Sequence, residues 1–258
     1  MLQNVVDSCL RTFLPARRFY YACLVCGLLC PSFFFGAFIA ADFIPPIKPW
    51  WSAERTAEHY QNHTIGIRVG AALMIFSGMF YLPYTVLIST QMNRIPWLPR
   101  GVSLLQAASG AASVFAFSLP AMVLAIAAYR PERSPEMTQM LNDMFWIFAV
   151  MPWPTFLSQN WAFAYAILVD TRAKPLFPKY MSMINMVVPL LLAPSLGLHF
   201  VKSGVVSWNG ALGFWVPGVA FSIQFLLDIC CLFRAIQTED IDQDRLPVDQ
   251  EQVKVALD

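Results

Sequence analysis

Charged residues are scarce in this chain. Asp, Glu, Lys and Arg make up 13% of its 258 residues, whereas they are about a quarter of an average soluble protein. Hydrophobic residues make up 57%, and the mean hydropathy is +0.54. This composition excludes an ordinary soluble domain and indicates an integral membrane protein in contact with a lipid bilayer. The net charge of +1 also excludes the basicity of a nucleic-acid-binding protein, so no nucleic-acid partner is expected.

Motifs of known chemistry are absent as well. The sequence has no Walker motif, no GxSxG or GxGxxG motif and no kinase signature. Its six cysteines follow neither a disulfide framework nor a CxxC…CxxC zinc pattern. They are expected as small apolar helix residues, with acylation of Cys9, Cys230 or Cys231 as the alternative. No cofactor is predicted.

Long uncharged apolar runs are what the sequence has in abundance. Each of six runs is longer than the roughly 18 residues that mark a candidate membrane span. They predict an all-α integral membrane protein, a polytopic bundle of about six transmembrane helices. The first run is too long for the apolar part of a signal peptide and is interpreted as a retained helix, although the letters AFIAAD resemble a cleavage site that would leave five spans. The runs cover residues 19–41, 69–93, 101–129, 144–169, 180–201 and 203–227.

Basic residues gather on one side of the predicted bundle. Cytoplasmic loops carry an excess of Lys and Arg, so both termini are expected in the cytoplasm, while the kind of membrane is not indicated. The chain then divides into a cytoplasmic segment 1–18, a membrane domain 19–235 and an acidic cytoplasmic tail 236–258. The basic-rich side receives Arg11, Arg17, Arg18, Arg94, Arg100, Arg172, Lys174, Lys179, Arg234, Arg245 and Lys254, and the other side receives Lys48, Arg55, Arg130, Arg133 and Lys202.

The longest external loop lies between the first and second runs. Trp50 and Trp51 are typical of the aromatic belt at a membrane interface. Ser52 is a suitable helix N-cap, and Glu54 falls in the first turn that would follow. A short external amphipathic helix from there to about Gln61 is therefore predicted to lie on the outer surface.

Two histidines share one face of this short helix. His59 and His63 are four residues apart, which brings side chains together on a helix. A metal ion would need a further ligand, for which His199, Glu58 and Asp143 are the candidates. Paired histidines in a polar helix are more often simply solvated, so no metal site is predicted.

The fourth run carries unusually many polar and aromatic residues. At helical spacing Asp143, Trp146, Trp153 and Asn160 lie on one face. An aromatic belt accounts for Trp146 near the membrane surface, but Trp153 lies too deep for that explanation. Trp153 therefore needs either a packing partner in a neighbouring helix or a cavity.

Two prolines interrupt the same run. Pro152 and Pro154 have no N–H, so the carbonyls of Phe148 and Val150 lose their helical donors. Open backbone at this depth is tolerated where it is buried in protein or lines a cavity. The interpretations left open are a kinked helix packed against its neighbours and a wall of a ligand pocket.

Polar residues elsewhere in the runs are informative because they are unfavourable in lipid. Gln106, Asn185, Gln224 and Asp228 are expected in an inner layer near the cytoplasmic ends of the helices. Most such residues are expected to be solvated helix ends. The third run also has small residues around Gly110, which predict a packing face for a neighbouring helix.

Three functions compete at this point. The first is binding or conversion of a lipophilic small molecule in an outward-opening aromatic pocket, with isomerase- or cyclase-like acid–base chemistry. The others are a small-solute transporter and a non-catalytic membrane subunit or scaffold. Whether the protein is an enzyme stays open. The candidate catalytic residues are Asp143, Glu58 and His59, and the candidate ligand-binding residues are Trp146, Trp153, Asn160, Arg68, Trp208 and Asn209.

Overall fold

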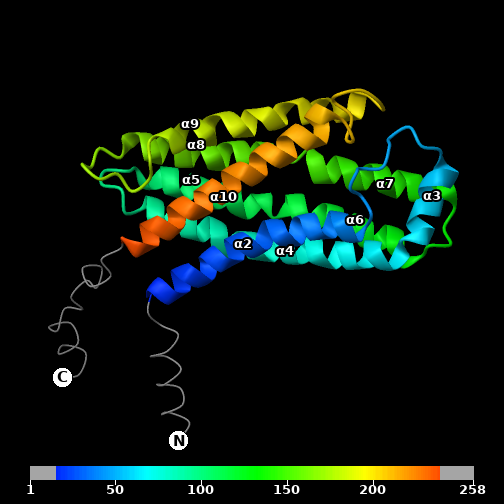
Figure 1. Cartoon of the computed structure of the whole chain (residues 1–258), viewed down its shortest axis with the longest axis horizontal. Helices are drawn as coiled ribbons and strands as arrows, with labels where there is room; N and C mark the ends of the chain where they lie inside the picture. Colours follow the sequence, from blue (N-terminus) through cyan, green and yellow to red (C-terminus); the bar gives the residue numbers. More distant parts are fainter. Residues whose placement is uncertain (1–15, 239–258) are drawn as a thin grey trace, which may run out of the picture.

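The computed structural model describes residues 16–238, and every regular element in that part of the chain is helical. The prediction of an all-α protein is confirmed there. Residues 1–15 and 239–258 lie outside the described range, and with them lie Cys9 and most of the two predicted cytoplasmic segments. Figure 1 shows the helices side by side in an elongated bundle, with α3 across one end. That end is called the α3 end below.

The helices follow one another with short connections, and two irregular segments occur near the carboxyl end. In chain order they are α2 (Ala16–Ala40), α3 (Ala53–Asn62), α4 (Thr64–Met92), α5 (Arg100–Ser113), α6 (Phe115–Tyr129), α7 (Pro135–Val150), α8 (Pro154–Val169), α9 (Tyr180–Val187), the 3-10 helix η1 (Val188–Phe200), the π-helical turn η2 (Ala211–Trp215) and α10 (Val216–Gln237).

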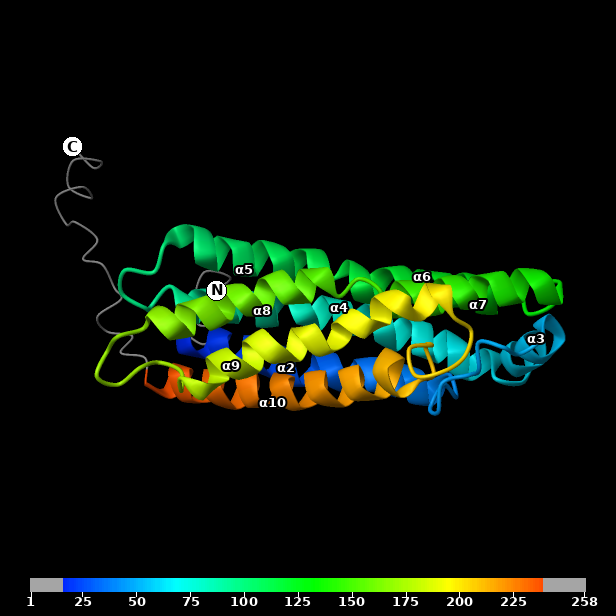
Figure 2. The same ribbon diagram turned by 90° about the horizontal axis from the view of Figure 1, so that it is seen from above.

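Five helical stretches are long and apolar enough to cross a membrane: Arg17–Ala40, Thr64–Met92, Arg100–Tyr129, Tyr180–Phe200 and Ala211–Gln237. Each matches one of the predicted runs, so the protein is a multi-pass integral membrane protein in a lipid bilayer. The remaining run, the fourth (residues 144–169), does not form one helix. It is divided between α7 and α8, which lie end to end in both Figure 1 and Figure 2.

The break between α7 and α8 follows from two prolines. The N–H of Met151 still donates to Ile147 O at 3.0 Å, but Pro152 has no N–H to continue the helix. The N–H of Trp153 instead donates to Met151 O at 2.8 Å, in a tight turn. Pro154 then begins α8, a position where its missing N–H has no intrahelical partner to lose.

Helix α3 forms where the loop sequence predicts it. Its first residue follows Ser52, whose Oγ accepts a hydrogen bond from the N–H of Arg55 at 3.4 Å. On its inner face Tyr60 is buried and donates from its hydroxyl to Asn142 Oδ1 of α7 at 3.2 Å. The helix is therefore attached to the bundle and not free above it.

Glycines allow the helices to approach closely. A Cβ on Gly70 of α4 would lie 2.7 Å from the carbonyl oxygen of Ala37 in α2, so only glycine fits there. On α5 a Cβ at Gly110 would collide with the side chain of Thr85 on α4. The small-residue face of the third run is thus a packing face, as predicted.

Candidate functional site

An apolar cavity of about 140 Å³ lies beside the break between α7 and α8. Its wall is built by α2, α6, α7, α8, η1, η2 and α10. Three prolines from different segments, Pro31, Pro152 and Pro217, line it together. Half of the remaining lining residues are aromatic, among them Phe34, Phe38, Phe117, Phe156, Phe214 and Phe221.

Backbone irregularity explains why space is left here. A proline removes one helical hydrogen bond and displaces the preceding turn, so the neighbouring helices cannot pack uniformly. Pro217 follows the π-helical turn η2, which is wider than an α-helix. Gly213 and Gly218 also line the cavity and contribute no side chain to fill it.

Trp153, in the wall of this cavity, has a buried polar atom without a partner among residues 16–238. Its side chain is only 8% exposed, yet its Nε1–H has no hydrogen-bond partner within the described part of the chain. The hydroxyls of Ser195 and Ser222 also line the cavity, but they donate to backbone, to Leu192 O and Gly218 O at 2.6 Å each. Leaving a buried donor unpaired costs about 1–3 kcal/mol. An occupant whose acceptor reached this buried N–H would remove that penalty.

Trp146 lies in a different environment, although the sequence places it on the same helical face as Trp153. It is fully buried, stacks on Trp208 with ring centroids 6.0 Å apart, and donates from Nε1 to Asn142 Oδ1 at 3.1 Å. Trp208 in turn donates to Ile47 O at 2.8 Å. The structure brings these two predicted ligand-binding tryptophans together, but neither lines the cavity. We call them, with Phe38, Phe43, Phe145 and Phe214, the Trp146 cluster.

Asn160 belongs to a buried polar network. Gln224 Nε2 donates to Asn160 Oδ1 and to Asn185 Oδ1, each at 2.9 Å. Asn185 Nδ2 donates to Asp228 Oδ1, also at 2.9 Å. All four side chains are at least 91% buried, whereas sequence reasoning expected most such residues to be solvated helix ends. Their occurrence inside apolar runs was the available signal for a shared network.

A second hydrogen-bonded group adjoins the first. Tyr81 donates to Gln159 Oε1 at 2.6 Å, and Gln159 Nε2 donates to Thr85 Oγ1 at 3.1 Å. Between the two groups is a cavity of about 10 Å³, close to the space of one water molecule. Phe221 and Phe225 line both cavities, so this polar layer lies directly beside the apolar cavity.

The candidate catalytic residues lie away from the apolar cavity. Glu58 is exposed on α3, and His59 Nε2 is 3.3 Å from the carbonyl oxygen of Ala41. Asp143 is half-buried on α7, where its Oδ1 accepts from Asn142 Nδ2 at 3.4 Å. No carboxylate or imidazole occurs among the residues that line the cavity.

Two further predicted ligand-binding residues also lie elsewhere. Arg68 donates from Nε to Ala128 O at 3.0 Å, and it forms no ion pair with Asp143 within residues 16–238. Asn209 accepts from Ser207 Oγ at 2.7 Å in the loop before η2. Of the six residues predicted to bind a ligand, the structure places Trp153 in the wall of the apolar cavity and Asn160 in the adjoining polar layer.

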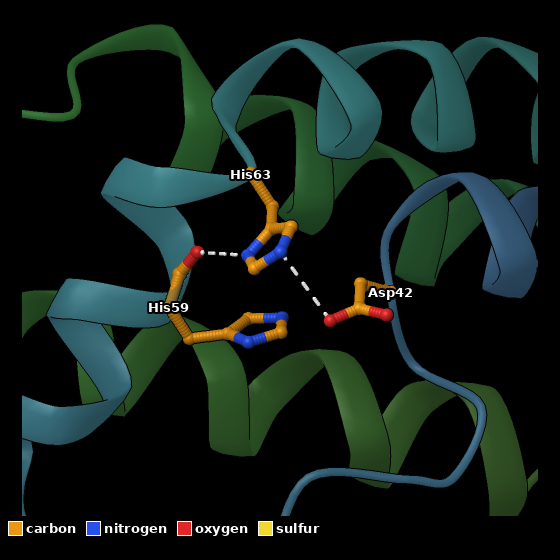
Figure 3. Close-up of side chains that lie close together, drawn as sticks. All are labelled: Asp42, His59 and His63. Atoms are coloured by element: carbon orange, nitrogen blue, oxygen red, sulfur yellow. Dashed lines mark hydrogen bonds and ion pairs between the residues drawn. The ribbon is translucent and has the colours of Figure 1, made fainter.

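A cluster of possible metal ligands lies at the α3 end. Asp42, His59 and His63 each have a ligand atom within 4.8 Å of the others. Figure 3 shows the three side chains close together. The sequence pointed to the two histidines but not to Asp42 as their partner. Burial lowers the pKa of His59 below its usual value, and the neighbouring His63 adds to that effect, so the neutral imidazole is favoured.

The opposite end of the bundle is closed by charged residues. Asp170 accepts from Arg172 Nε at 2.8 Å and Nη2 at 2.6 Å, and from the N–H of Leu176 at 2.8 Å. Burial alone would raise the pKa of Asp170, but these hydrogen bonds outweigh it and hold the pKa below its usual value. Lys179 also donates to the carbonyl oxygens that end α8. These contacts cap the carboxyl end of α8 and have a structural role.

Comparisons with protein-family models, with curated proteins and with solved structures found no match. Function is therefore inferred from the apolar cavity, the polar layer and the Asp42 cluster. Of these, the apolar cavity is the one that can hold a small molecule.

Proposed function

We propose that this protein binds a lipophilic small molecule in the apolar cavity beside the α7–α8 break. The observation that carries the proposal is the buried, unpaired Nε1–H of Trp153 in a wall that is otherwise apolar. An empty apolar cavity of about 150 Å³ is known to admit benzene, so a cavity of about 140 Å³ suits a ring or a branched chain segment. The ligand class is an apolar skeleton with one carbonyl or ether oxygen near the indole.

Binding is favoured over acid–base catalysis at this site. General acid–base chemistry needs a titratable side chain within hydrogen-bond reach of the reacting group. The lining of the cavity offers aromatic rings, serine hydroxyls and the thiol of Cys30, but no carboxylate or imidazole. We therefore place the protein among carriers or sensors of apolar molecules, and the isomerase- or cyclase-like alternative has less support.

Native mass spectrometry of the detergent-purified protein tests the proposal. We expect a bound apolar molecule in the wild type and a roughly three- to tenfold weaker affinity in Trp153→Phe, which keeps a ring but removes the donor. Trp161→Phe is the matched control, because Trp161 is exposed and donates to Met186 O outside the cavity. A wild type that retains no ligand and takes up none from lipid extracts would refute the proposal.

The membrane topology is part of the same proposal. Helices α7 and α8 lie end to end and together make one broken crossing, which brings the number of crossings to six and both termini to the cytoplasm. We expect impermeant thiol reagents on intact cells to label Glu132→Cys and Ser203→Cys, which are exposed positions, and to miss Lys174→Cys. Labelling of Lys174→Cys alone would reverse the orientation.

A transporter is the second candidate, and the polar layer is the observation that favours it. Asp228 is a buried carboxylate beside a water-sized cavity, an arrangement that membrane proteins use in ion and proton pathways. Transport would appear as flux of an apolar acid or a small solute into proteoliposomes. It should then be lost in Asp228→Asn, while ligand retention persists.

A further inference from the structure

Asp42, His59 and His63 come from the loop after α2 and from the carboxyl-terminal end of α3. Asp42 follows the end of α2, His59 lies on α3, and His63 joins α3 to α4. Figure 3 shows both imidazole rings and the carboxylate directed toward a common gap. The ring centroids of the two histidines are 4.5 Å apart. Helical spacing pairs the two histidines, and the fold adds the carboxylate of Asp42 to them.

Hydrogen bonding defines the tautomer of His63. Its Nδ1 is 2.9 Å from the carbonyl oxygen of His59. A carbonyl can only accept, so Nδ1 carries the hydrogen. In the neutral ring Nε2 then has a lone pair, and this atom lies 3.3 Å from Oδ2 of Asp42. An imidazole lone pair and a carboxylate oxygen that face each other at this distance can bind the same metal ion.

The neighbouring side chains hold the second imidazole in place. His59 stacks on Phe43 with an interplanar angle of 21° and centroids 5.5 Å apart. Its Nε2 lies 3.3 Å from the carbonyl oxygen of Ala41, a long contact in which Nε2 carries the hydrogen. Binding an ion through this nitrogen would replace that contact and release the proton. Metal-binding histidines are commonly oriented by such outer contacts, including a ring N–H that donates to a backbone carbonyl, as in His63.

We propose that Asp42, His59 and His63 bind a zinc ion. Two imidazole nitrogens and one carboxylate oxygen are a ligand set that Zn²⁺ accepts, and three protein ligands leave a fourth position for water or another molecule. The side chains of Asp42 and His63 are 61% and 39% exposed, so an ion can reach them from solvent. Ligand atoms up to 4.8 Å apart must move closer, which an exposed carboxylate can do by rotation.

The site is independent of the apolar cavity. None of its three residues lines that cavity. A bound zinc ion would join the loop after α2 to α3 and to the start of α4, and so stabilise the α3 end of the bundle. Zinc binding can therefore be tested independently of ligand binding in the apolar cavity.

Isothermal titration with zinc tests the site in the full-length protein, purified on a tag without histidines and stripped of metal. We expect one zinc per chain, bound at least about tenfold more weakly by His63→Ala and by Asp42→Asn. His199→Ala is the matched control, because this histidine is exposed and outside the cluster, and it should bind zinc as the wild type does. At the same zinc concentration, zinc should also raise the Tm of the wild type more than that of His63→Ala.

Two results would overturn the proposal. One is the absence of saturable zinc binding in the wild type, and the other is equal zinc affinity in the wild type and His63→Ala. In either case Asp42, His59 and His63 do not form a zinc site. Should His63→Ala fail to fold, as judged by size-exclusion chromatography without zinc, the exposed Asp42→Asn variant decides the question by the same titration.

Discussion

Two tryptophans in one predicted span, Trp146 and Trp153, have opposite surroundings. Trp146 is enclosed by aromatic rings, and its indole donates to Asn142. Trp153 is also buried, but it lines a cavity, and its indole N–H is unpaired. The backbone accounts for the difference, because Trp146 lies within the regular helix α7 and Trp153 lies in the turn between two prolines. The close packing around Trp146 thus stabilises the fold, and the cavity beside Trp153 leaves room for a ligand.

The largest expected effect is that of removing the closed tryptophan. Trp146→Ala should lower the free energy of unfolding by about 3–5 kcal/mol, since it opens a large cavity among rigid rings. Trp153→Ala should cost clearly less, because that ring already has empty space on one side. Thermal unfolding in detergent measures both, with the exposed Trp215→Ala as the control. Equal losses for the two variants would mean that the regions do not differ.

Removing the acceptor of Trp146 should make it resemble Trp153. Asn142 Oδ1 accepts from Trp146 and from the hydroxyl of Tyr60, so Asn142→Ala leaves two buried donors unpaired. We expect a loss of about 1–3 kcal/mol in stability. Asn209→Ala, which removes an acceptor from a half-exposed loop, should change the Tm little. An unchanged stability in Asn142→Ala would show that the hydrogen bond of the indole does not distinguish the two tryptophans.

Enlarging a small residue should act differently in the two regions. Ala121 is fully buried in the same core as Trp146, so Ala121→Leu should destabilise by about 1–3 kcal/mol through overpacking. Ala149 lines the apolar cavity, so Ala149→Leu should be tolerated while it displaces the ligand. Unfolding and native mass spectrometry measured on the same samples separate these outcomes. Loss of folding in Ala149→Leu would indicate a cavity too small for an occupant.

The contribution of the hydrogen-bonded Asp170 to stability should depend on pH. Because the pKa of Asp170 is below its usual value in the folded protein, its contribution is complete above the unfolded pKa of about 3.9. The contribution is lost as the pH falls from there through the folded-state pKa. The free energies of unfolding of the wild type and Asp170→Asn should therefore differ by roughly 1 kcal/mol near neutral pH, and this difference should shrink below about pH 4. Thermal unfolding at a series of pH values measures it. A difference that grows toward acid would contradict this assignment.

The smallest effect is expected at the helix break itself. Ser195 Oγ lies 3.5 Å from the Val150 carbonyl oxygen that the prolines leave open, a long contact of little strength. Ser195→Ala should change stability by less than about 0.5 kcal/mol, although Ser195 lines the cavity. Ligand affinity is the second readout, and it should stay within about threefold of the wild type. A large loss of affinity would identify Ser195 as a ligand contact in place of Trp153.

Local signals in the sequence predicted much of the fold. The apolar runs identified the long helices, Ser52 identified the start of α3, and Pro152 and Pro154 identified the break in the fourth run. Each of these features depends on residues close in the chain, through helix geometry, capping or a missing N–H. The same local rules also identified the His59 and His63 pair.

The candidate sites depended on neighbours that the sequence does not specify. Helical periodicity placed Trp146 and Trp153 on one face, but it could not show that Trp208 covers the first and that Pro31 and Pro217 leave space beside the second. In the same way, Asp42 meets the two histidines only because the chain folds back after α2.

The sequence by itself determined that this is a helical membrane protein, where its helices lie along the chain and where one of them is interrupted. Those properties follow from hydrophobic run length and from the backbone chemistry of proline, both of which act locally. Only the tertiary structure decided which buried groups are paired, where the cavity lies and which carboxylate joins the histidines. Packing between helices sets these, and it depends on contacts between residues far apart in the chain.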